Sequence, residues 1–277
     1  MRYLFDCWNK IKKKVDSKAV ALFLDFDGTL APIADTPEKV IISPHTKESL
    51  NKISKNGSFR LAVISGRALS DIKRILGISG IIYVGNHGLE IEGPKIRYTI
   101  FAAQKYRAIV DKIKKELKEK TFSIKGVRLE DKGLTLSLHY RLASKKDTNL
   151  IRTIFYETTI VPAVKNIIKT TTGKMVLEVR PALDWDKGKV VLWLLARWKF
   201  MLKDRDIVPI YIGDDTTDED AFRALKNKGV TIFVGIAENS SAQYYLKDTK
   251  EASCFLRKLL DLQKDKNGGF NQGKRTV

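Results

Sequence analysis

The strongest constraint on the fold is a short apolar run that ends at acidic residues, residues 19–26 (AVALFLDF). Its apolar residues do not alternate with polar ones, a pattern typical of a strand covered on both faces within a parallel sheet. Further apolar runs alternate with amphipathic segments before and after the middle of the chain. This alternation predicts an α/β protein built around a Rossmann-like parallel sheet.

Helix start and stop signals support this prediction. Pro44 follows Ser43 at the expected start of a helix, and Gly57 follows its expected end. The α/β rhythm resumes after Pro181. The predicted helices cover residues 43–56, 69–76, 187–200, 217–225 and 252–262, and the further strands cover 59–64, 81–84, 207–212 and 230–234.

The middle of the chain has a different order of elements, α-β-β-α-β-β. Two helices, each followed by a β-hairpin, are predicted at residues 101–120 with 127–140, and at 148–158 with 164–179. Such a pattern favours an antiparallel sheet with helices on one side. We therefore predict a discontinuous core domain, residues 1–100 and 182–277, with an inserted cap domain, residues 101–181.

Charge and cysteine content narrow the class of function. The 277 residues carry a formal net charge of +19, a property shared with many nucleic-acid-binding proteins. The lysines are spread along the chain without a zinc-finger or RNA-binding signature, which favours solvated helix faces and attraction for anionic substrates. Cys7 and Cys254 are too few for a disulfide scaffold or a zinc site. Without a membrane-spanning apolar run or a signal peptide, the chain is expected in the cytoplasm.

Polar side chains follow the predicted core strands at their carboxyl ends, where ligands bind in open parallel sheets. Asp25 and Asp27 lie two residues apart, so both leave the strand end on the same side. One carboxylate can then attack phosphorus while the other transfers protons. Gly28 allows a tight turn after them. Ser65 and Arg67 follow the next strand and offer hydrogen-bond donors to phosphoryl oxygens.

A lysine and an acidic segment complete this set of groups. Lys187 lies at a predicted helix start, where the helix dipole disfavours a cation unless an anion is near. Residues 213–220 (GDDTTDED) follow the strand at 207–212 and are rich in carboxylates. These acids predict a hard cation such as Mg²⁺. Together the groups indicate covalent hydrolysis of a phosphate monoester.

The four groups, in this order, resemble the motifs of the haloacid dehalogenase (HAD) superfamily. The resemblance implies that Asp25 is the nucleophile and Asp27 the general acid/base. It implies that Ser65 and Lys187 hold the phosphoryl group. The inserted segment resembles a type IIB-like cap, found in members that act mainly on sugar phosphates.

The resemblance also implies a magnesium site. Its ligands would be Asp25, the carbonyl of Asp27 and the carboxylate of Asp214. Asp215 or Asp218 would lie close by. The predicted cofactor is therefore Mg²⁺.

Further motifs resemble the trehalose-6-phosphate phosphatase family over about residues 20 to 240. They are residues 24–32 (LDFDGTLAP), 65–67 (SGR), 85–90 (GNHGLE), 130–141 (EDKGLTLSLHYR), 173–181 (GKMVLEVRP) and 213–222 (GDDTTDEDAF). The substrate-binding residues that this resemblance implies are Arg67, His87, Glu130, Lys132, Lys174 and Glu178. Arg67 and His87 are expected between cap and core. His139 and Arg141 either contact the sugar or hold the cap together.

The sequence thus predicts a magnesium-dependent trehalose-6-phosphate phosphatase with an aspartyl-phosphate intermediate. Alternatives with the same chemistry are phosphatases of sucrose 6-phosphate, mannosyl-3-phosphoglycerate or a hexose monophosphate. Another class of alternative is a non-catalytic sugar-phosphate sensor or a nucleic-acid-binding protein on the same fold. Opening and closing of the cap would require hinges, which we expect near residues 88–94 and 181–185. The N-terminal segment and the C-terminal tail match no motif.

Overall fold

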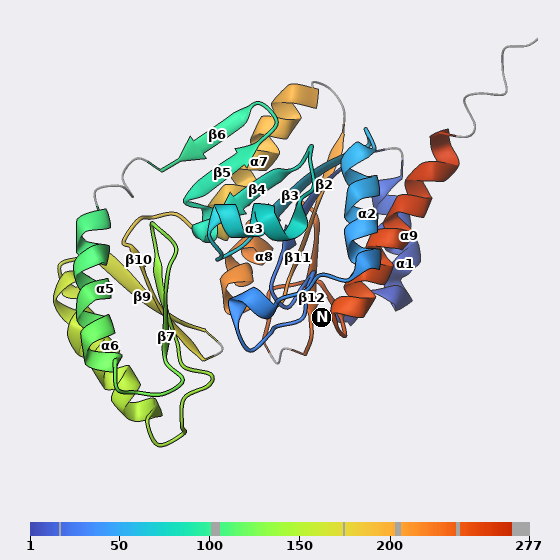
Figure 1. The fold of residues 1–277 in the computed structure, drawn as a ribbon. Coiled ribbons are helices and arrows are strands. Elements are labelled where there is room, and N and C mark those ends of the chain that lie inside the picture. The colour runs from blue at the N-terminus through green and yellow to red at the C-terminus, as the bar shows by residue number, and fades with distance from the viewer. Residues whose placement is uncertain (17, 101–105, 174, 203–205, 237–238, 268–277) are drawn as a thin grey trace, which may run out of the picture.

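The computed structural model describes residues 1–16, 18–100, 106–173, 175–202, 206–236 and 239–267. Two β-sheets, each covered by helices, lie side by side (Figure 1). From one edge to the other, the larger sheet contains β1 (Arg2–Tyr3), β13 (Tyr244–Leu246), β12 (Val230–Val234), β11 (Ile207–Gly213), β2 (Ala19–Asp25), β3 (Phe59–Ile64), β4 (Ile82–Gly85), β5 (Glu90–Gly93) and β6 (Ile96–Thr99). The smaller sheet contains β7 (Arg128–Asp131), β8 (Leu136–His139), β10 (Val176–Pro181) and β9 (Ile168–Gly173).

Helices cover both faces of the larger sheet and one face of the smaller. The α-helices are α1 (Trp8–Val15), α2 (Pro44–Lys55), α3 (Leu69–Leu76), α5 (Arg107–Thr121), α6 (Thr148–Val164), α7 (Lys187–Leu202), α8 (Glu219–Ala224) and α9 (Thr249–Asn267). Short 3₁₀ turns that concern the site are η2 (Pro37–Lys39), η3 (Asn86–Gly88) and η4 (Thr216–Asp218). The α/β fold predicted from the sequence is confirmed.

Strand β2 shows why its sequence is apolar throughout. All seven of its residues are buried. Leu22 and Leu24 pack into the apolar cluster that includes α1, α2, α3 and α9, whereas Ala21 and Phe23 pack into the cluster that includes α7 and α8. Because successive side chains point to opposite faces, a strand with both faces covered needs apolar residues at every position.

β2 also lies where the order of the sheet reverses. In the order of the sheet, all strands from the β1 edge as far as β4 run parallel. β11 and β3 lie on either side of β2. The chain leaves β2 toward β3 and β4 on one side and later fills the other side with β11 and β12. In open parallel sheets, this reversal point is where ligands bind.

The smaller sheet is antiparallel and has one apolar and one polar face. Leu138 and Leu177 pack with residues of α5 and α6 in an apolar cluster of their own. On the other face of this sheet, Glu178 of β10 lies opposite Ser137 of β8 and Thr171 of β9. Figure 1 shows α5 and α6 on the side of this sheet that faces away from the larger sheet. The polar face is therefore directed toward the larger sheet.

Helix α6 is longer than predicted. It continues to Val164, so that β9 begins at Ile168 rather than at residue 164. The buried hydroxyl of Thr159 donates to the carbonyl of Phe155, which satisfies it inside the helix. The first five residues of the helix predicted at 101–120 lie outside the described residues.

Segments without a recognised motif form the edges of the larger sheet. The N-terminal segment supplies β1, which pairs with β13, and α1, whose Trp8 ring contacts the Phe255 ring of α9 edge-on at 6.0 Å between centroids. At the other edge, β5 pairs antiparallel with β4 and β6. β5 is therefore hydrogen-bonded on both sides, and the hinges expected near residues 88–94 and 181–185 stay predictions.

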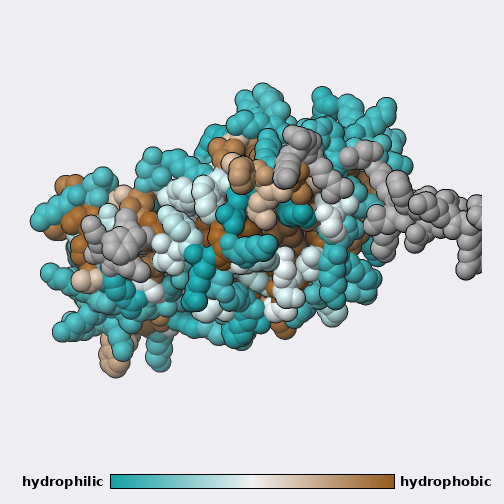
Figure 2. All heavy atoms as spheres, turned by 90° about the horizontal axis from the view of Figure 1, so that it is seen from above, coloured by the Kyte–Doolittle hydropathy of each residue, from teal (hydrophilic) through white to brown (hydrophobic). Residues whose placement is uncertain are grey.

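The face of the molecule seen from above is mostly polar. Figure 2 shows hydrophilic residues over most of the face seen from above, with smaller hydrophobic areas between them. Within the described residues, no helix combines the length and apolar character needed to span a membrane.

Candidate active site

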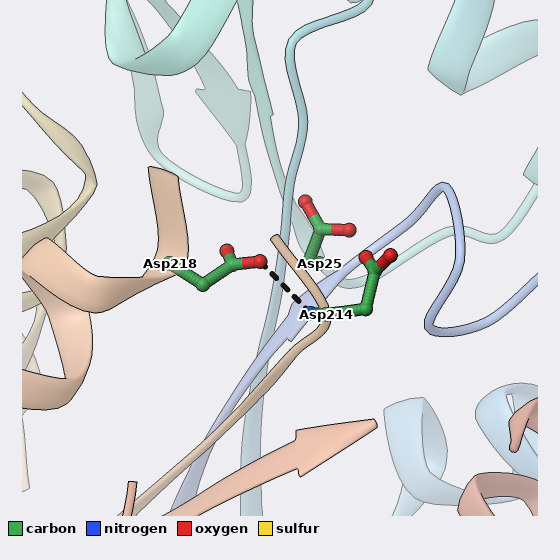
Figure 3. A group of neighbouring side chains, drawn as sticks. All are labelled: Asp25, Asp214 and Asp218. Carbon is green, nitrogen blue, oxygen red and sulfur yellow. Dashed lines mark hydrogen bonds between the residues drawn. The ribbon is translucent and has the colours of Figure 1, made fainter. Parts of the chain in front are cut away.

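The strand ends bring the predicted catalytic groups together. Asp25 ends β2, Asp214 follows β11, and Ser65 follows β3. The three strands are neighbours in the sheet. Figure 3 shows the side chains of Asp25, Asp214 and Asp218 grouped at this edge. The structure therefore brings together the side chains expected at these parallel strand ends, and their catalytic role stays a prediction.

Three buried carboxylates form the centre of the site. Asp25, Asp214 and Asp218 each offer an oxygen such that all three oxygens lie within 4.8 Å of one another. Burial raises the pKa of Asp25 well above its usual value, and the charges of Asp218 and Asp214 raise it further, while Lys187 opposes them. A cation at this group would relieve the repulsion between the carboxylates.

Lys187 lies between two of these acids. Its Nζ donates to Oδ1 of Asp25 and to Oδ1 of Asp218, both at 2.6 Å, and its side chain is 3% exposed. Burial would lower the pKa of this ammonium, but the two carboxylates outweigh it and raise the pKa above its usual value. Lys187 is therefore a fixed positive charge at the start of α7.

Asp218 holds the other groups in place. Its Oδ1 accepts from Lys187 and from the hydroxyl of Tyr211, and its Oδ2 accepts from the backbone N–H groups of Asp214 and Asp215. Both oxygens are thus used within the protein. Asp215 is another predicted metal residue in this loop. Its side chain accepts from the backbone N–H of Thr216.

Tyr211 was missed by sequence reasoning. Its hydroxyl donates to Asp218 at 2.6 Å from within β11, and the side chain is fully buried. Burial and then the charge of Asp218 raise its pKa well above the usual value, so it remains a donor. A tyrosine among apolar residues of a strand was the available signal, because a buried tyrosine hydroxyl needs a partner.

Asp27 is held by arginine rather than by the acidic group. Arg67 Nε donates to Asp27 Oδ2 at 2.8 Å, and another Arg67 nitrogen donates to Oδ1 at 2.7 Å. Arg67 also donates to Asp71 and to the carbonyl of Pro37. The guanidinium predicted to bind substrate is therefore only 7% exposed and acts here on Asp27.

Two glycines allow neighbouring side chains of the site to pack closely against the backbone. At Gly28, which has φ +85°, a Cβ would collide with the carboxylate of Asp214. At Gly66, next to Ser65, a Cβ would collide with the ring of His87. Glycine is thus required at Gly28 by backbone conformation and at both positions by close approach.

The polar face of the smaller sheet contributes a buried charge cluster around Glu178. Lys132 Nζ lies 2.9 Å from Glu178 Oε1, and His87 Nε2 lies 3.0 Å from Oε2, which also accepts from Arg180. Burial would raise the pKa of Glu178, but Lys132, His87 and Arg180 hold it well below the usual value. Burial lowers the pKa of His87 to about 3, so its ring is neutral at pH 7.

The remaining cap residues lie nearby. His139 Nε2 is 2.7 Å from Glu130 Oε2, which supports the alternative that His139 stabilises the cap. Arg141 lines the same cleft. Lys174 lies outside the described residues. Arg180, within the motif at residues 173–181, was not among the predicted site residues, because strand alternation alone does not reveal its contact with Glu178.

A cleft with a volume of about 590 Å³ lies between the two sheets. Asp25 and Lys187 line it on the side of the larger sheet, and Glu130, Lys132 and Glu178 line it on the other side. Groups that could bind a phosphoryl group therefore face groups that could bind hydroxyls.

Comparisons with known proteins agree with this arrangement. Residues 23–250 match the trehalose-phosphatase family model. The chain belongs to the trehalose-phosphatase family. It is 35% identical to probable trehalose-phosphate phosphatase D of Arabidopsis thaliana, over 92% of this chain and 70% of that one. It is 34% identical to trehalose 6-phosphate phosphatase RA3 of Zea mays, over 87% of this chain and 70% of that one.

Solved structures show the same fold. The C-terminal domain of C. albicans trehalose-6-phosphate phosphatase superposes with a TM-score of 0.79 at 22% identity, over 91% of this chain and 96% of that chain. A trehalose-6-phosphate phosphatase related protein gives 0.76 at 24% identity, over 89% and 99%. As a member of the trehalose-phosphatase family, the chain is a phosphatase with the HAD fold.

The site of this phosphatase suits a divalent metal ion. Its donors are buried carboxylate oxygens, which hard divalent cations prefer. The pKa of Asp25 is raised by burial and by its acidic neighbours, and a cation would stabilise the ionised form. Asp25 and Asp214 are the best placed of the three, because both oxygens of Asp218 already accept two hydrogen bonds each.

Proposed function

We propose that this phosphatase hydrolyses trehalose 6-phosphate to trehalose and phosphate, with Asp25 as the nucleophile. One observation carries the assignment of the nucleophile. The Asp25 carboxylate ends the central strand, is bound by Lys187, and lines a cleft whose opposite wall is polar. Membership of the family supports the choice of trehalose 6-phosphate as substrate.

The reaction would take place in two steps. A carboxylate oxygen of Asp25 forms a bond to phosphorus while the bond between phosphorus and the sugar oxygen breaks, and Asp27 gives that oxygen its proton. Water then attacks phosphorus, Asp27 removes a proton from this water, and the bond from phosphorus to Asp25 breaks. Phosphate leaves and both aspartates are restored.

Asp27 must change partners for this role. In this structure its carboxylate accepts from Arg67, so when substrate binds it would leave the guanidinium, take up a proton from solvent and turn toward the sugar oxygen. Catalytic hydrogen bonds often form only in the complex with substrate. Arg67 would then hold Asp27 in its resting position between turnovers.

Lys187, Ser65 and a metal ion would stabilise the phosphoryl group. Lys187 already contacts Asp25. The Ser65 hydroxyl accepts from the backbone N–H of Arg67 at 3.2 Å, and this hydrogen bond orients the hydroxyl at the start of the loop. We propose Mg²⁺ held by Asp25, Asp27 and Asp214, with Asp215 and Asp218 beside it. When bound, Mg²⁺ would neutralise charge on the transferring phosphoryl group.

The sugar would be bound by the cap, for which we propose the boundaries 101–181. Glu130, Lys132 and Glu178 line the cleft and present carboxylate and ammonium groups suited to sugar hydroxyls. We propose the same role for Lys174 and, at the junction with the core, for His87. The expected cytoplasmic location and the expected absence of nucleic-acid binding stay predictions.

A substrate panel tests this proposal. Phosphate release is measured with Mg²⁺ for trehalose 6-phosphate, sucrose 6-phosphate, glucose 6-phosphate and mannosyl-3-phosphoglycerate. We expect the highest kcat/KM for trehalose 6-phosphate and no turnover after chelation of the metal. Preference for another member of the panel would refute the sugar assignment and leave the chemistry intact.

The nucleophile is tested separately with Asp25→Asn. We expect turnover to fall by at least about 10⁴-fold, because the covalent step is lost. The circular dichroism spectrum should be unchanged, and the control Asp6→Asn, at the N-terminal edge of the sheet, should keep normal activity. Normal hydrolysis by Asp25→Asn would refute the assignment.

A further inference from the structure

A buried asparagine at the junction between core and cap carries a further inference. Asn86 begins the turn η3 directly after β4 and is 0% exposed. It has a left-handed backbone, with φ +49°, and the following His87 has φ +56°. Asparagine tolerates this conformation better than most residues, and two such residues in succession are uncommon.

The side-chain amide of Asn86 joins the two sheets. Its Nδ2 donates to Oε2 of Glu90 at 2.5 Å and to the backbone carbonyl of Lys132 at 3.0 Å. Its Oδ1 accepts from the hydroxyl of Thr135 at 2.8 Å. Glu90 belongs to β5 of the core, whereas Lys132 and Thr135 flank the turn between β7 and β8 of the cap. Both amide N–H groups and the amide oxygen are therefore satisfied, two of these bonds crossing to the cap.

The backbone of the same turn is bonded to the loop that carries Ser65. The N–H of Asn86 donates to the carbonyl of Arg67 at 2.7 Å, and the N–H of His87 donates to the carbonyl of Ser65 at 2.9 Å. Lys132 closes the circuit, because its Nζ donates to the carbonyl of Gly66 at 3.0 Å as well as to Glu178. One short turn thus touches the proposed phosphate-binding loop with its backbone and the proposed sugar-binding turn with its side chain.

We propose that Asn86 is a positioning residue that couples sugar binding in the cap to the geometry of the Ser65 loop. Its amide fixes the β7–β8 turn, and with it Lys132, at the cleft. Its backbone transmits that position to the Ser65 loop through bonds to residues 65 and 67. Asn86 needs no contact with substrate for this role. The coupling to sugar rests on the proposed function, whereas the contact between turn and cap does not.

The test uses a variant of nearly the same shape. Asn86→Asp keeps the size and the tolerance for positive φ, but it replaces the amide donor with an oxygen that faces the Lys132 carbonyl and the Glu90 carboxylate. Thr135→Val removes the hydroxyl on the cap side of the same contact. Asn227→Gly is the matched control, because Asn227 also has a positive φ (64°) but is exposed on a turn between α8 and β12.

The first readout is steady-state kinetics with trehalose 6-phosphate. We expect Asn86→Asp and Thr135→Val to raise KM by about tenfold, since each leaves buried polar groups without partners, with a smaller change in kcat. Asn227→Gly should match the wild-type protein. Unchanged KM in both cap-contact variants, with an active wild-type protein, would overturn the proposal.

The second readout is inhibition by the two products, trehalose and inorganic phosphate. In the wild-type protein each product should tighten binding of the other, by a factor of about 5 or more if the sites are coupled. In Asn86→Asp phosphate alone should inhibit as before, but the mutual effect should disappear. A substitution that only destabilises the protein would weaken the binding of both products and leave the mutual effect of trehalose and phosphate unchanged. That result would also overturn the proposal.

The third readout does not depend on the substrate. Hydrogen exchange of the wild-type protein and of Asn86→Asp is compared for residues 128–139, with residues 19–25 as the internal reference. We expect faster exchange in the cap segment alone. If the wild-type protein fails to hydrolyse trehalose 6-phosphate, the proposed function fails, and this exchange experiment still decides whether Asn86 fixes the cap turn.

Discussion

The two walls of the cleft are both charged, yet they are built in different ways. On the core wall, Asp25 and Asp214 stand at the ends of neighbouring parallel strands, so the sheet brings them together, and Lys187 reaches them from the start of α7. On the cap wall, Glu178 lies on β10 and Lys132 directly follows β7, and β8 separates these two strands in the sheet. Their contact depends on the register of an antiparallel sheet and on its position against the core.

This difference separates two kinds of task. The core wall holds a fixed arrangement of charges, which is what stabilisation of a transferring phosphoryl group requires. On the cap wall, Glu178 pairs with Lys132 and contacts the His87 ring, and in the proposed complex sugar hydroxyls would replace some of these partners. Substitutions in the core wall should therefore abolish chemistry, whereas those in the cap wall should alter substrate affinity and selectivity.

The largest effect is expected for Lys187→Met. This change leaves the buried carboxylates of Asp25 and Asp218 without their shared partner, so the free energy of unfolding should fall by about 3–5 kcal/mol without metal. The value of kcat should fall by at least about 10³-fold. Urea unfolding and phosphate release measure the two effects. Added Mg²⁺ should restore part of the stability, because it would bind the native carboxylates.

Lys189→Met is the control for that substitution. Lys189 is two residues away on the same helix and pairs with the exposed Asp184. Stability and turnover should both stay near those of the wild-type protein. Equal losses in the two variants would show that α7 tolerates no such change, and the special role of Lys187 would have no support.

A smaller effect is expected for Glu178→Gln in the cap wall. The amide keeps the shape but removes the charge that Lys132 and Arg180 face, so KM for trehalose 6-phosphate should rise about tenfold or more. The value of kcat should change less, and inhibition by phosphate alone should stay the same. Glu92→Gln is the control, because Glu92 pairs with Lys73 and is only partly buried. A loss confined to kcat would place Glu178 in the chemical step and break the distinction between the walls.

The lowered pKa of Glu178 also predicts how the stability of the protein depends on pH. Its pKa is held well below the usual value in the folded protein. The stabilisation that its pairs provide is therefore complete above the pKa of an unfolded glutamate, about 4.3, and is lost as the pH falls through the folded value. Urea unfolding should show a smaller acid-induced loss of stability in Glu178→Gln than in the wild-type protein.

The same contrast explains what the sequence could predict. Strand β2 and the groups after it are encoded locally, by an apolar run followed by acids, so the position of Asp25 followed from the sequence. Lys187 was placed at a helix start correctly, but its contact with Asp218 depends on how α7 packs, which no local pattern encodes.

Contacts between distant segments account for what was missed. Arg67 was expected to contact substrate. It lines the cleft, and its contacts with Asp27 and the Pro37 carbonyl depend on tertiary structure, whereas Asp71 lies only four residues along the chain. Asn86 stood within a recognised motif, but its partners lie 46 and 49 residues away. Short edge strands such as β6 were missed because pairing, rather than composition, defines them.

The smallest effect is expected for an exposed contact across the same two walls, the ion pair of Arg128 in β7 with Glu38 in η2. The side chains are 45% and 52% exposed, so Arg128→Ala should cost less than about 1 kcal/mol of stability. The hydrogen bond from Arg128 lowers the pKa of Glu38 to about 2. Solvent screening reduces the contribution of this ion pair to the stability of the folded protein. Because the pKa of Glu38 is lowered, this contribution is present above about pH 4.3 and is lost as the pH falls toward 2.

Salt sharpens this last comparison. About 0.5 M NaCl should remove the difference between Arg128→Ala and the wild-type protein, because an exposed pair is screened. The effect of Asn86→Asp, whose contact is buried and lies at the same junction, should persist in salt. Cap closure would then depend on the buried amide rather than on the exposed charges. If the two variants showed the same KM and the same salt dependence, closure would be electrostatic and the distinction between buried and exposed contacts at this junction would be lost.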